Sequence, residues 1–230
     1  MPFFQPSLDD MNKEVLAWDM FQMLQEKPMY LLRTVPLRFS SVDEYLDVFE
    51  PLLLEECRAQ TLRSMQENQV EDDHLQIASI DPNEPFRCIT FALESKGDAN
   101  EPQVKTYYDN DLVFVSYEQL LDDGAEEGEE GEARPPPHQF HALGLVAHTT
   151  ADSVKLKFYL PELPTSRLIP SQHKRLSLLR KVMVPTSGKW WLKKLGNMVT
   201  INREFQARIL HPPPCSSPAI CACASAHALA

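Results

Sequence analysis

A stretch of helical pattern between residues 39 and 67 constrains the fold of this chain more than any other part of its sequence. Ser41 and Glu44 have the spacing of a capping box, in which each side chain satisfies a backbone donor at the start of a helix. The apolar side chains after this start recur at roughly helical spacing; they are Tyr45, Val48, Phe49, Leu52, Leu53, Cys57 and Leu62. Pro51 lacks an N–H and suits either a kink or the first turn of a second helix. The stretch therefore predicts helices that pack one face on a core.

The rest of the chain alternates between helical and strand-like patterns. An amphipathic helix is expected from Asp10 to a point near Pro28, and a short helix is expected at 199–210. Five short β-prone runs separated by turn residues lie between these helices, at 75–80, 87–94, 112–117, 140–148 and 154–160. Residues 178–184 and 191–195 suggest two further strands. The predicted fold class is α+β, with N-terminal helices, a small antiparallel β-barrel and a returning helix.

The charge of the chain is distributed unevenly. Its net charge is −11, yet residues 155–208 carry 12 Lys and Arg against 2 acids, and the remaining residues carry 10 against 31. This asymmetry predicts a basic surface that is available to a polyanion. Residues 122–137 are rich in Glu, Gly and Pro and cannot bury a core, so they predict a disordered insertion. Two roles stay open for the insertion, a solubilising loop and a competitor for the basic surface.

Several features that would define other classes of protein are missing from the sequence. There is no run of about 18 apolar residues and no secretory start, so neither a membrane span nor secretion is expected. Five cysteines without the spacing of a disulfide framework indicate a reducing compartment. The pair Gly188-Lys189 is followed by Trp190 and lacks the spacing of a phosphate-binding loop. No nucleophile or acid–base pair has a supporting context, so no catalytic residue is expected.

Two groups of residues could suggest a metal site, and neither has the pattern of one. His138 and His141 supply two ligands where a closed zinc site needs four, so a structural role is expected for them. Cys215, Cys221 and Cys223 are not arranged as a paired Cys-x-x-Cys motif, and they lie in an uncharged end of the chain that predicts a disordered tail. No metal site is therefore expected.

Segments of the chain resemble one family of helicases, in the order in which that family carries them. Residues 39–45 (FSSVDEY) and 49–56 (FEPLLLEE) resemble the segment before the motor in senataxin-like superfamily 1 helicases, which include the plant MAGATAMA type. Residues 199–207 (VTINREFQA) are similar to the Thr-x-x-Arg-Glu-(Tyr/Phe)-x-Ala helix that these helicases carry shortly before their nucleotide-binding motifs. Between them, residues 111–116 (DLVFVS) resemble an Asp-Leu-Val strand of the family's small β-barrel. The resemblance covers roughly residues 35–210.

The resemblance, together with the residue patterns described above, implies a layout of five parts. These are a helical brace at 1–34, stalk helices at 35–70, a β-barrel at 71–198 that contains the insertion at 122–137, a returning stalk helix at 199–210 and a disordered tail at 211–230. In the family, the barrel lies over the nucleic-acid channel of a nuclear enzyme that uses ATP and magnesium to unwind RNA–DNA hybrids or duplexes. This chain has no nucleotide-binding motif, so it is expected to need no cofactor and to be inactive alone. Its last residues are expected to come from a truncated or alternatively spliced gene model.

Seven basic side chains and one aromatic side chain are the expected contacts to nucleic acid. Lysine and arginine neutralise phosphate charge, and the expected phosphate contacts are Lys174, Arg175, Arg180, Lys181, Lys189, Lys193 and Lys194. Trp190 or its neighbour Trp191 is the expected stacking platform for a base, and the other is expected in the core because adjacent strand residues face opposite sides. The expected partner is single-stranded RNA or DNA, or an RNA–DNA hybrid. The alternative is a protein-interaction module whose basic face packs on a partner or on a missing motor.

Overall fold

The computed structural model describes residues 7–25, 27–67, 73–82, 85–93, 107–117, 140–165 and 168–210. Its elements in chain order are α1 (Leu8–Ala17), α2 (Met20–Met23), α3 (Val42–Glu67), β1 (Asp73–Asp81), β2 (Phe86–Ala92), β3 (Asp111–Ser116), β4 (His141–Thr149), β5 (Ser153–Tyr159), α4 (Pro170–Val182), β6 (Lys189–Asn197) and α5 (Val199–Leu210). The expected insertion at 122–137 and the expected tail at 211–230 lie outside the described residues. Among the helices of the described ranges, none combines the length and the apolar character that crossing a membrane requires.

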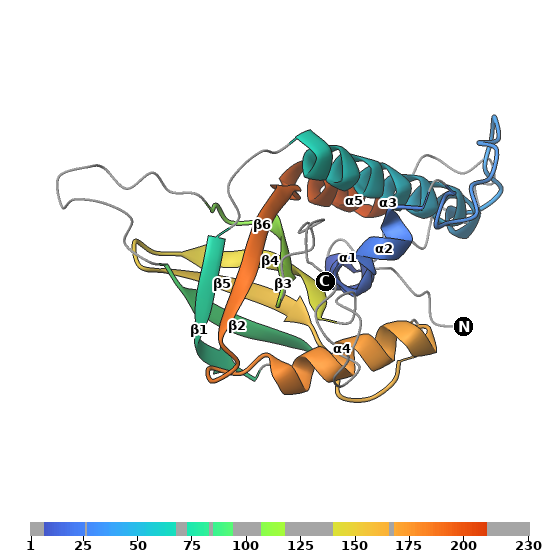
Figure 1. The fold of residues 1–230 in the computed structure, drawn as a ribbon. Coiled ribbons are helices and arrows are strands. Elements are labelled where there is room, and N and C mark those ends of the chain that lie inside the picture. The colour runs from blue at the N-terminus through green and yellow to red at the C-terminus, as the bar shows by residue number, and fades with distance from the viewer. Residues whose placement is uncertain are drawn as a thin grey trace, which may run out of the picture.

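Six antiparallel strands form a closed sheet, in which every strand pairs with two neighbours (Figure 1). The strand order is β1-β2-β5-β4-β3-β6, and β6 completes the ring by pairing with β1, where Leu75 lies opposite Trp190. Along β5, Val154, Leu156 and Phe158 are buried and the lysines between them are only partly buried, as the two-residue period of a strand requires. The expected α+β class is confirmed, and each of the five expected β-prone runs forms a strand.

Close packing inside the closed sheet requires a glycine on β4. Gly144 lies opposite Val113 of β3, and a Cβ atom at Gly144 would lie 2.8 Å from the ring of Phe158. The Phe158 side chain is fully buried and has no free space beside it in a close-packed interior. The ring therefore occupies the volume that any larger residue at this position would need.

Helix α3 continues through Pro51 as a single helix of 26 residues, although a proline removes one N–H from the helix. Its start differs in part from the expected capping box. The backbone N–H of Glu44 donates to Ser41 Oγ at 3.1 Å, as expected, whereas the Glu44 carboxylate accepts from the backbone N–H of Ser40 at 2.6 Å. The hydrogen bonds from the side chain and backbone of Ser40 lower the pKa of the Glu44 carboxyl.

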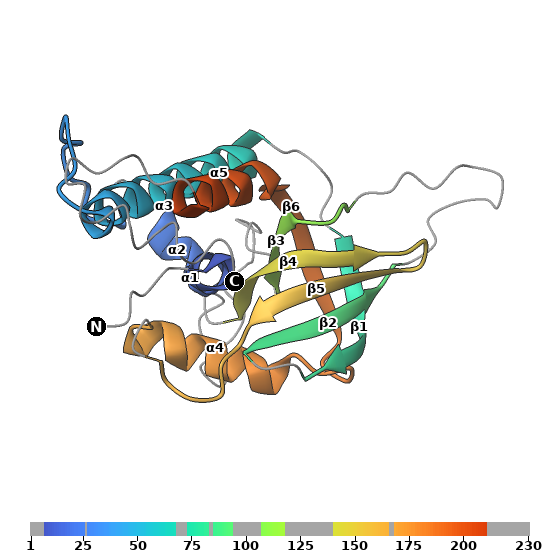
Figure 2. The ribbon, with the colours of Figure 1, turned by 180° about the vertical axis from the view of Figure 1, so that it is seen from behind.

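Helices α3 and α5 lie side by side and antiparallel (Figures 1 and 2). Near the end of α5, Arg208 Nη1 donates to the backbone oxygen of Phe49 near the start of α3, at 3.3 Å. At the other end of the pair, Cys57 Sγ lies 3.7 Å from Met198 Sδ. The chain between these two helices forms the closed sheet and α4. The chain therefore enters this part from α3 and leaves it through α5, and the two helices lie together. The bounds of α5 match the expected helix.

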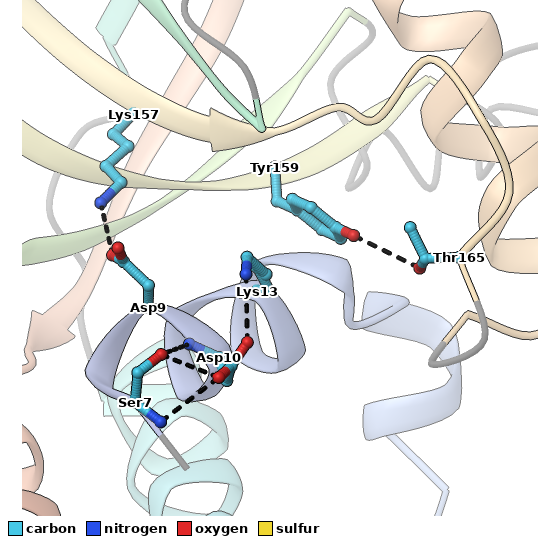
Figure 3. Close-up of polar contacts among 7 residues, drawn as sticks. All are labelled: Ser7, Asp9, Asp10, Lys13, Lys157, Tyr159 and Thr165. Atoms are coloured by element: carbon cyan, nitrogen blue, oxygen red, sulfur yellow. Dashed lines mark hydrogen bonds and ion pairs between the residues drawn. The ribbon is translucent and has the colours of Figure 1, made fainter. Parts of the chain in front are cut away.

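The expected N-terminal helix is divided into α1 and α2, and it begins before Asp10. Ser7 forms a capping box with Asp10: the Asp10 backbone N–H donates to Ser7 Oγ at 3.1 Å, and the Ser7 N–H donates to Asp10 Oδ2 at 3.3 Å (Figure 3). The helix stops after Ala17, and Asp19 caps α2 by accepting the Phe21 N–H at 2.9 Å. The expectation of one continuous helix was wrong because it missed this second cap.

Residues 178–184, expected as a strand, belong mostly to helix α4. Pro170 is the first residue of this helix, a position where its fixed φ favours helix and its missing N–H costs nothing. Leu176, Leu179 and Met183 are fully buried and recur at helical spacing, so the run that resembled a strand is one apolar face of a helix. The other expected strand, at 191–195, is confirmed within β6.

Candidate nucleic-acid interface

The basic residues between 155 and 208 do not lie on one face of the closed sheet. β5 pairs with β2 and β4, whereas β6 pairs with β1 and β3, so the two lysine-bearing strands lie on opposite sides of the ring. Both β5 lysines also have acidic partners: Lys155 pairs with Asp81, and Lys157 Nζ lies 3.3 Å from Asp9 Oδ1 of α1 (Figure 3). The two lysines of β5 therefore belong to local ion pairs and lie apart from the basic residues of β6.

Helix α4 presents two of the expected phosphate contacts to solvent. Lys174 and Lys181 are exposed. They are seven residues apart, which places them about two turns apart on the same side of an α-helix. These two side chains remain available for binding a polyanion.

Arg175 is the neighbour of Lys174, but its guanidinium points into the protein. Only 6% of the residue is exposed. Nη1 donates to the backbone oxygen of His141 at 2.7 Å, and Nη2 donates to the backbone oxygens of Ala17 and Trp18 at 2.8 and 3.0 Å. Burial lowers the pKa of Arg175 to about 10, and Asp19, 3.6 Å from Nε, opposes this shift. The expected phosphate contact of Arg175 is corrected, because the side chain joins α1, α4 and β4 instead.

Arg180 is also engaged within the protein. Its Nη1 donates to the backbone oxygen of Leu160 at 2.8 Å, and its Nη2 lies 3.6 Å from Glu162 Oε2. These contacts hold the chain that follows β5 against α4. Arg180 would have to give up its ion pair with Glu162 to contact a phosphate with the same nitrogen.

The expected stacking residue of β6 lies inside the closed sheet. Trp190 is 0% exposed, its Nε1 donates to Ser187 Oγ at 2.8 Å, and its ring meets Tyr117 edge-on at a centroid distance of 5.2 Å. A base cannot stack on a ring that is covered on both faces, so the expected role of Trp190 is corrected. The adjacent Trp191 is partly exposed.

The three lysines of β6 differ in their surroundings. Lys189 is exposed and Lys193 is partly exposed. Lys194 Nζ lies 2.6 Å from Asp111 Oδ2, whose side chain is 1% exposed, and also lies over the ring of Tyr108 at 4.9 Å. Lys194 therefore neutralises a buried carboxylate and is a structural residue.

Four of the eight expected contacts remain accessible, and we call them the lysine set: Lys174, Lys181, Lys189 and Lys193. Two come from α4 and two from β6, which are consecutive elements of the chain. Ammonium groups bind phosphates as point charges and read no sequence. The described part of the chain contains no group of three or more His, Cys, Asp or Glu residues that could hold a metal ion.

A polar cluster of Asp19, His141 and Arg175 escaped prediction, and two of its members, His141 and Arg175, are buried. His141 is 0% exposed, its Nε2 accepts the backbone N–H of Met20 at 3.1 Å, and the same nitrogen lies 3.6 Å from Asp19 Oδ1. The three residues come from the link between α1 and α2, from β4 and from α4, so no sequence spacing could reveal them. The structural role expected of His141 is thus seen in detail, whereas His138 lies outside the described residues.

Comparison with known proteins places the chain near helicases. It is 22% identical over 275 aligned positions to a probable helicase of Dictyostelium discoideum. This alignment covers 89% of the chain and 27% of that protein. It is 24% identical over 212 aligned positions to the probable helicase MAGATAMA 3 of Arabidopsis thaliana. This second alignment covers 84% of the chain and 24% of that protein. No protein-family model matches the chain. The chain is thus related to probable helicases. It spans about a quarter of the length of the curated relatives it matches.

Proposed function

We propose that this chain is an accessory nucleic-acid-binding region of a nuclear, senataxin-like helicase, and that it has no ATP-dependent motor of its own. In this proposal α3 and α5 are the stalk, the closed sheet is the β-barrel that the stalk carries, and α1 with α2 is the brace. Binding of ATP and magnesium belongs to the motor of the longer protein. The binding partner is single-stranded RNA or DNA, or an RNA–DNA hybrid.

The observation that carries this proposal is the antiparallel pair of α3 and α5. The chain runs outward along α3, forms the closed sheet and returns along α5, where Arg208 meets Phe49. A part whose entry and exit lie together can be carried by a larger protein without disturbing that protein's own core. The relatives support this reading, because each is about four times as long as the stretch it shares with this chain.

The lysine set is the proposed contact to the phosphate backbone. Each lysine that contacts a phosphate releases counterions, so the logarithm of the affinity should fall linearly with the logarithm of the salt concentration, by about 0.7 per contact for a single strand. A titration of single-stranded RNA by fluorescence anisotropy, at several salt concentrations, measures this slope. We expect weak binding at low salt, because the lysine set supplies four charges.

Matched double variants test which lysines make the contacts. Lys174→Ala with Lys181→Ala removes two exposed charges from α4, and Lys155→Ala with Lys157→Ala removes two charges from β5 that already belong to local ion pairs. The first variant should flatten the salt slope by up to about 1.4, and the second should leave it unchanged. Equal effects of both variants would show that net charge alone governs binding and would refute the proposed contacts.

A protein-interaction module is the second candidate function, and the division of the basic residues favours it. Arg175, Arg180 and Lys194 are already engaged within the protein. The remaining lysines could then pack on a partner protein or on the motor of the longer protein. No RNA binding at low salt would make this candidate the better one.

A further inference from the structure

The imidazole of His141, at the start of β4, lies beside the link between α1 and α2. The residue is 0% exposed. Its ring is stacked on Phe114 of β3 at a centroid distance of 5.8 Å, and Phe21 of α2 meets it edge-on at 5.4 Å. Strand β3 and helix α2 therefore enclose the imidazole from two sides.

One hydrogen bond fixes the charge of this imidazole. Nε2 of His141 accepts the backbone N–H of Met20 at 3.1 Å. A ring nitrogen that accepts a hydrogen bond carries no proton, so the imidazole is neutral in the folded protein. The same bond ties the first residue of α2 to the first residue of β4, which are 121 positions apart in the chain.

The charged groups beside the ring disfavour a second proton on it. Arg175 of α4 donates to the backbone oxygen of His141 at 2.7 Å, so a cation already lies next to this residue. Asp19 of the link lies 3.6 Å from Nε2, which is too far for a hydrogen bond. Its carboxylate also has Arg175 Nε at 3.6 Å and accepts the Phe21 N–H at 2.9 Å. One carboxylate would therefore have to balance two cations.

A proton on Nε2 would break the contact that joins the link to β4. The protonated nitrogen is a donor, so the Met20 N–H would lose its acceptor and two donors would face each other. A buried donor without an acceptor and a buried charge without a partner both destabilise a fold, and both are relieved when water reaches them. The backbone oxygens of Ala17 and Trp18, which accept from Arg175 at 2.8 and 3.0 Å, border the link and would move with it.

We propose that His141 is a pH-sensitive latch: when its Nε2 takes up a proton, the link between α1 and α2 separates from β4 and α4. Above about pH 6.5, where an imidazole in water is mostly neutral, the latch is closed. At lower pH the open form binds one proton more than the closed form, so the equilibrium constant for opening should rise by up to about tenfold per pH unit. Carboxylates titrate near pH 4, so they contribute little between about pH 6.5 and 5.5.

Amide hydrogen exchange of the full 230-residue chain, followed by mass spectrometry at several pH values, measures the opening. Rates are compared with those of an unfolded chain at the same pH, which gives the protection of residues 17–23. In the wild type this protection should fall by up to about tenfold per pH unit below about pH 6.5.

Two variants separate the latch from other titrating groups. In His141→Gln the side-chain oxygen can still accept the Met20 N–H but does not titrate, so the protection of residues 17–23 should not fall. The control is His148→Gln, which changes an exposed histidine of the same strand and should behave as the wild type does. An unchanged protection in the wild type, or an equal fall in the wild type and His141→Gln, would overturn the proposal.

A proton NMR titration of the wild type tests the latch without any variant, and decides the matter if His141→Gln does not fold. The signal of the His141 ring should remain that of a neutral imidazole for as long as residues 17–23 stay protected. Protonation of the ring while this protection is intact would show that the fold accommodates the charge, and would likewise overturn the proposal.

Discussion

Replacing Arg175 by methionine separates the two roles that a basic residue of α4 could have. If Arg175 contacted nucleic acid, Arg175→Met would weaken RNA binding and leave the fold intact. The structure predicts the reverse, because the guanidinium donates to the backbone oxygens of His141, Ala17 and Trp18 and is only 6% exposed. Methionine is a comparable helix former, so the substitution changes the contacts more than the helix propensity.

The expected size of the effect follows from these three acceptors. A buried acceptor that loses its donor destabilises the fold by about 1–3 kcal/mol, so three of them give at least about 3 kcal/mol. Removing the guanidinium also removes the cost of burying its charge, which is the main cause of the lowered pKa of about 10. This gain keeps the expected loss near the lower limit, at about 3 kcal/mol.

Urea unfolding followed by tryptophan fluorescence measures this loss, because Trp18 and Trp190 are both 0% exposed. With a slope of about 1–3 kcal/mol per molar urea, the midpoint for Arg175→Met should fall by about 1–3 M. Lys174→Met is the matched control: it makes the same change of charge at the adjacent, exposed position and should alter stability by no more than about 0.5 kcal/mol.

The opposite pattern would refute this reasoning. An unchanged midpoint for Arg175→Met, together with a flatter salt slope for RNA binding, would show that the guanidinium reaches the phosphates and is not needed by the fold. Arg175→Lys adds a further check, since lysine keeps the charge but lacks the planar fork that serves several carbonyl oxygens at once. It should restore only part of the lost stability.

Further predictions concern the core, the pH dependence of stability and the lack of a motor. Gly144→Ala should destabilise the protein by about 1–3 kcal/mol, because the new methyl group would meet the Phe158 ring. Gly196→Ala is the control: the nearest neighbour of its new methyl group is Ser64 Oγ at 3.6 Å, so stability should change by no more than about 0.5 kcal/mol. Burial raises the pKa of the Cys57 thiol from 9.0 to about 12, so the unfolded chain loses this proton first, and stability should fall above pH 9 by up to about 1.4 kcal/mol per pH unit. Urea midpoints at pH 9 and pH 10 should therefore differ less in Cys57→Ala than in the wild type, and an equal decline in both would contradict the assignment. The purified chain should hydrolyse no ATP with or without RNA, and hydrolysis above that of a mock preparation would contradict the absence of a phosphate-binding loop.

Local sequence patterns were sufficient to find most of the elements. The bounds of α5 and the positions of β1 to β5 follow from short periodic runs between turn residues, which act over a few neighbouring positions. The run at 178–184 was misread because a short apolar segment fits a buried strand as well as one face of a helix. Pro170 was the local signal that could have decided between them, since it starts α4.

The candidate site depended much less on local pattern. Sequence alone located a basic segment, and within it Lys174 and Arg175 are adjacent and chemically alike. Only the tertiary structure shows that one faces solvent and the other is buried against α1 and β4. In the same way, the sequence paired Trp190 with Trp191 on opposite faces of a strand but could not state which face is the interior.

The sequence by itself therefore determined the periodic elements and the uneven charge, because each of these is a property of neighbouring residues or of composition. The relation to helicases came from a resemblance of short segments, which the comparisons support. The tertiary structure decided which charges are accessible, how the basic residues divide between β5 and β6, and that the end of α5 lies beside the start of α3. The physical reason is that the surroundings of a side chain are set by residues far away in the chain. Lys194 illustrates it: its carboxylate partner, Asp111, lies on another strand, and only the pairing of β3 with β6 brings the two together.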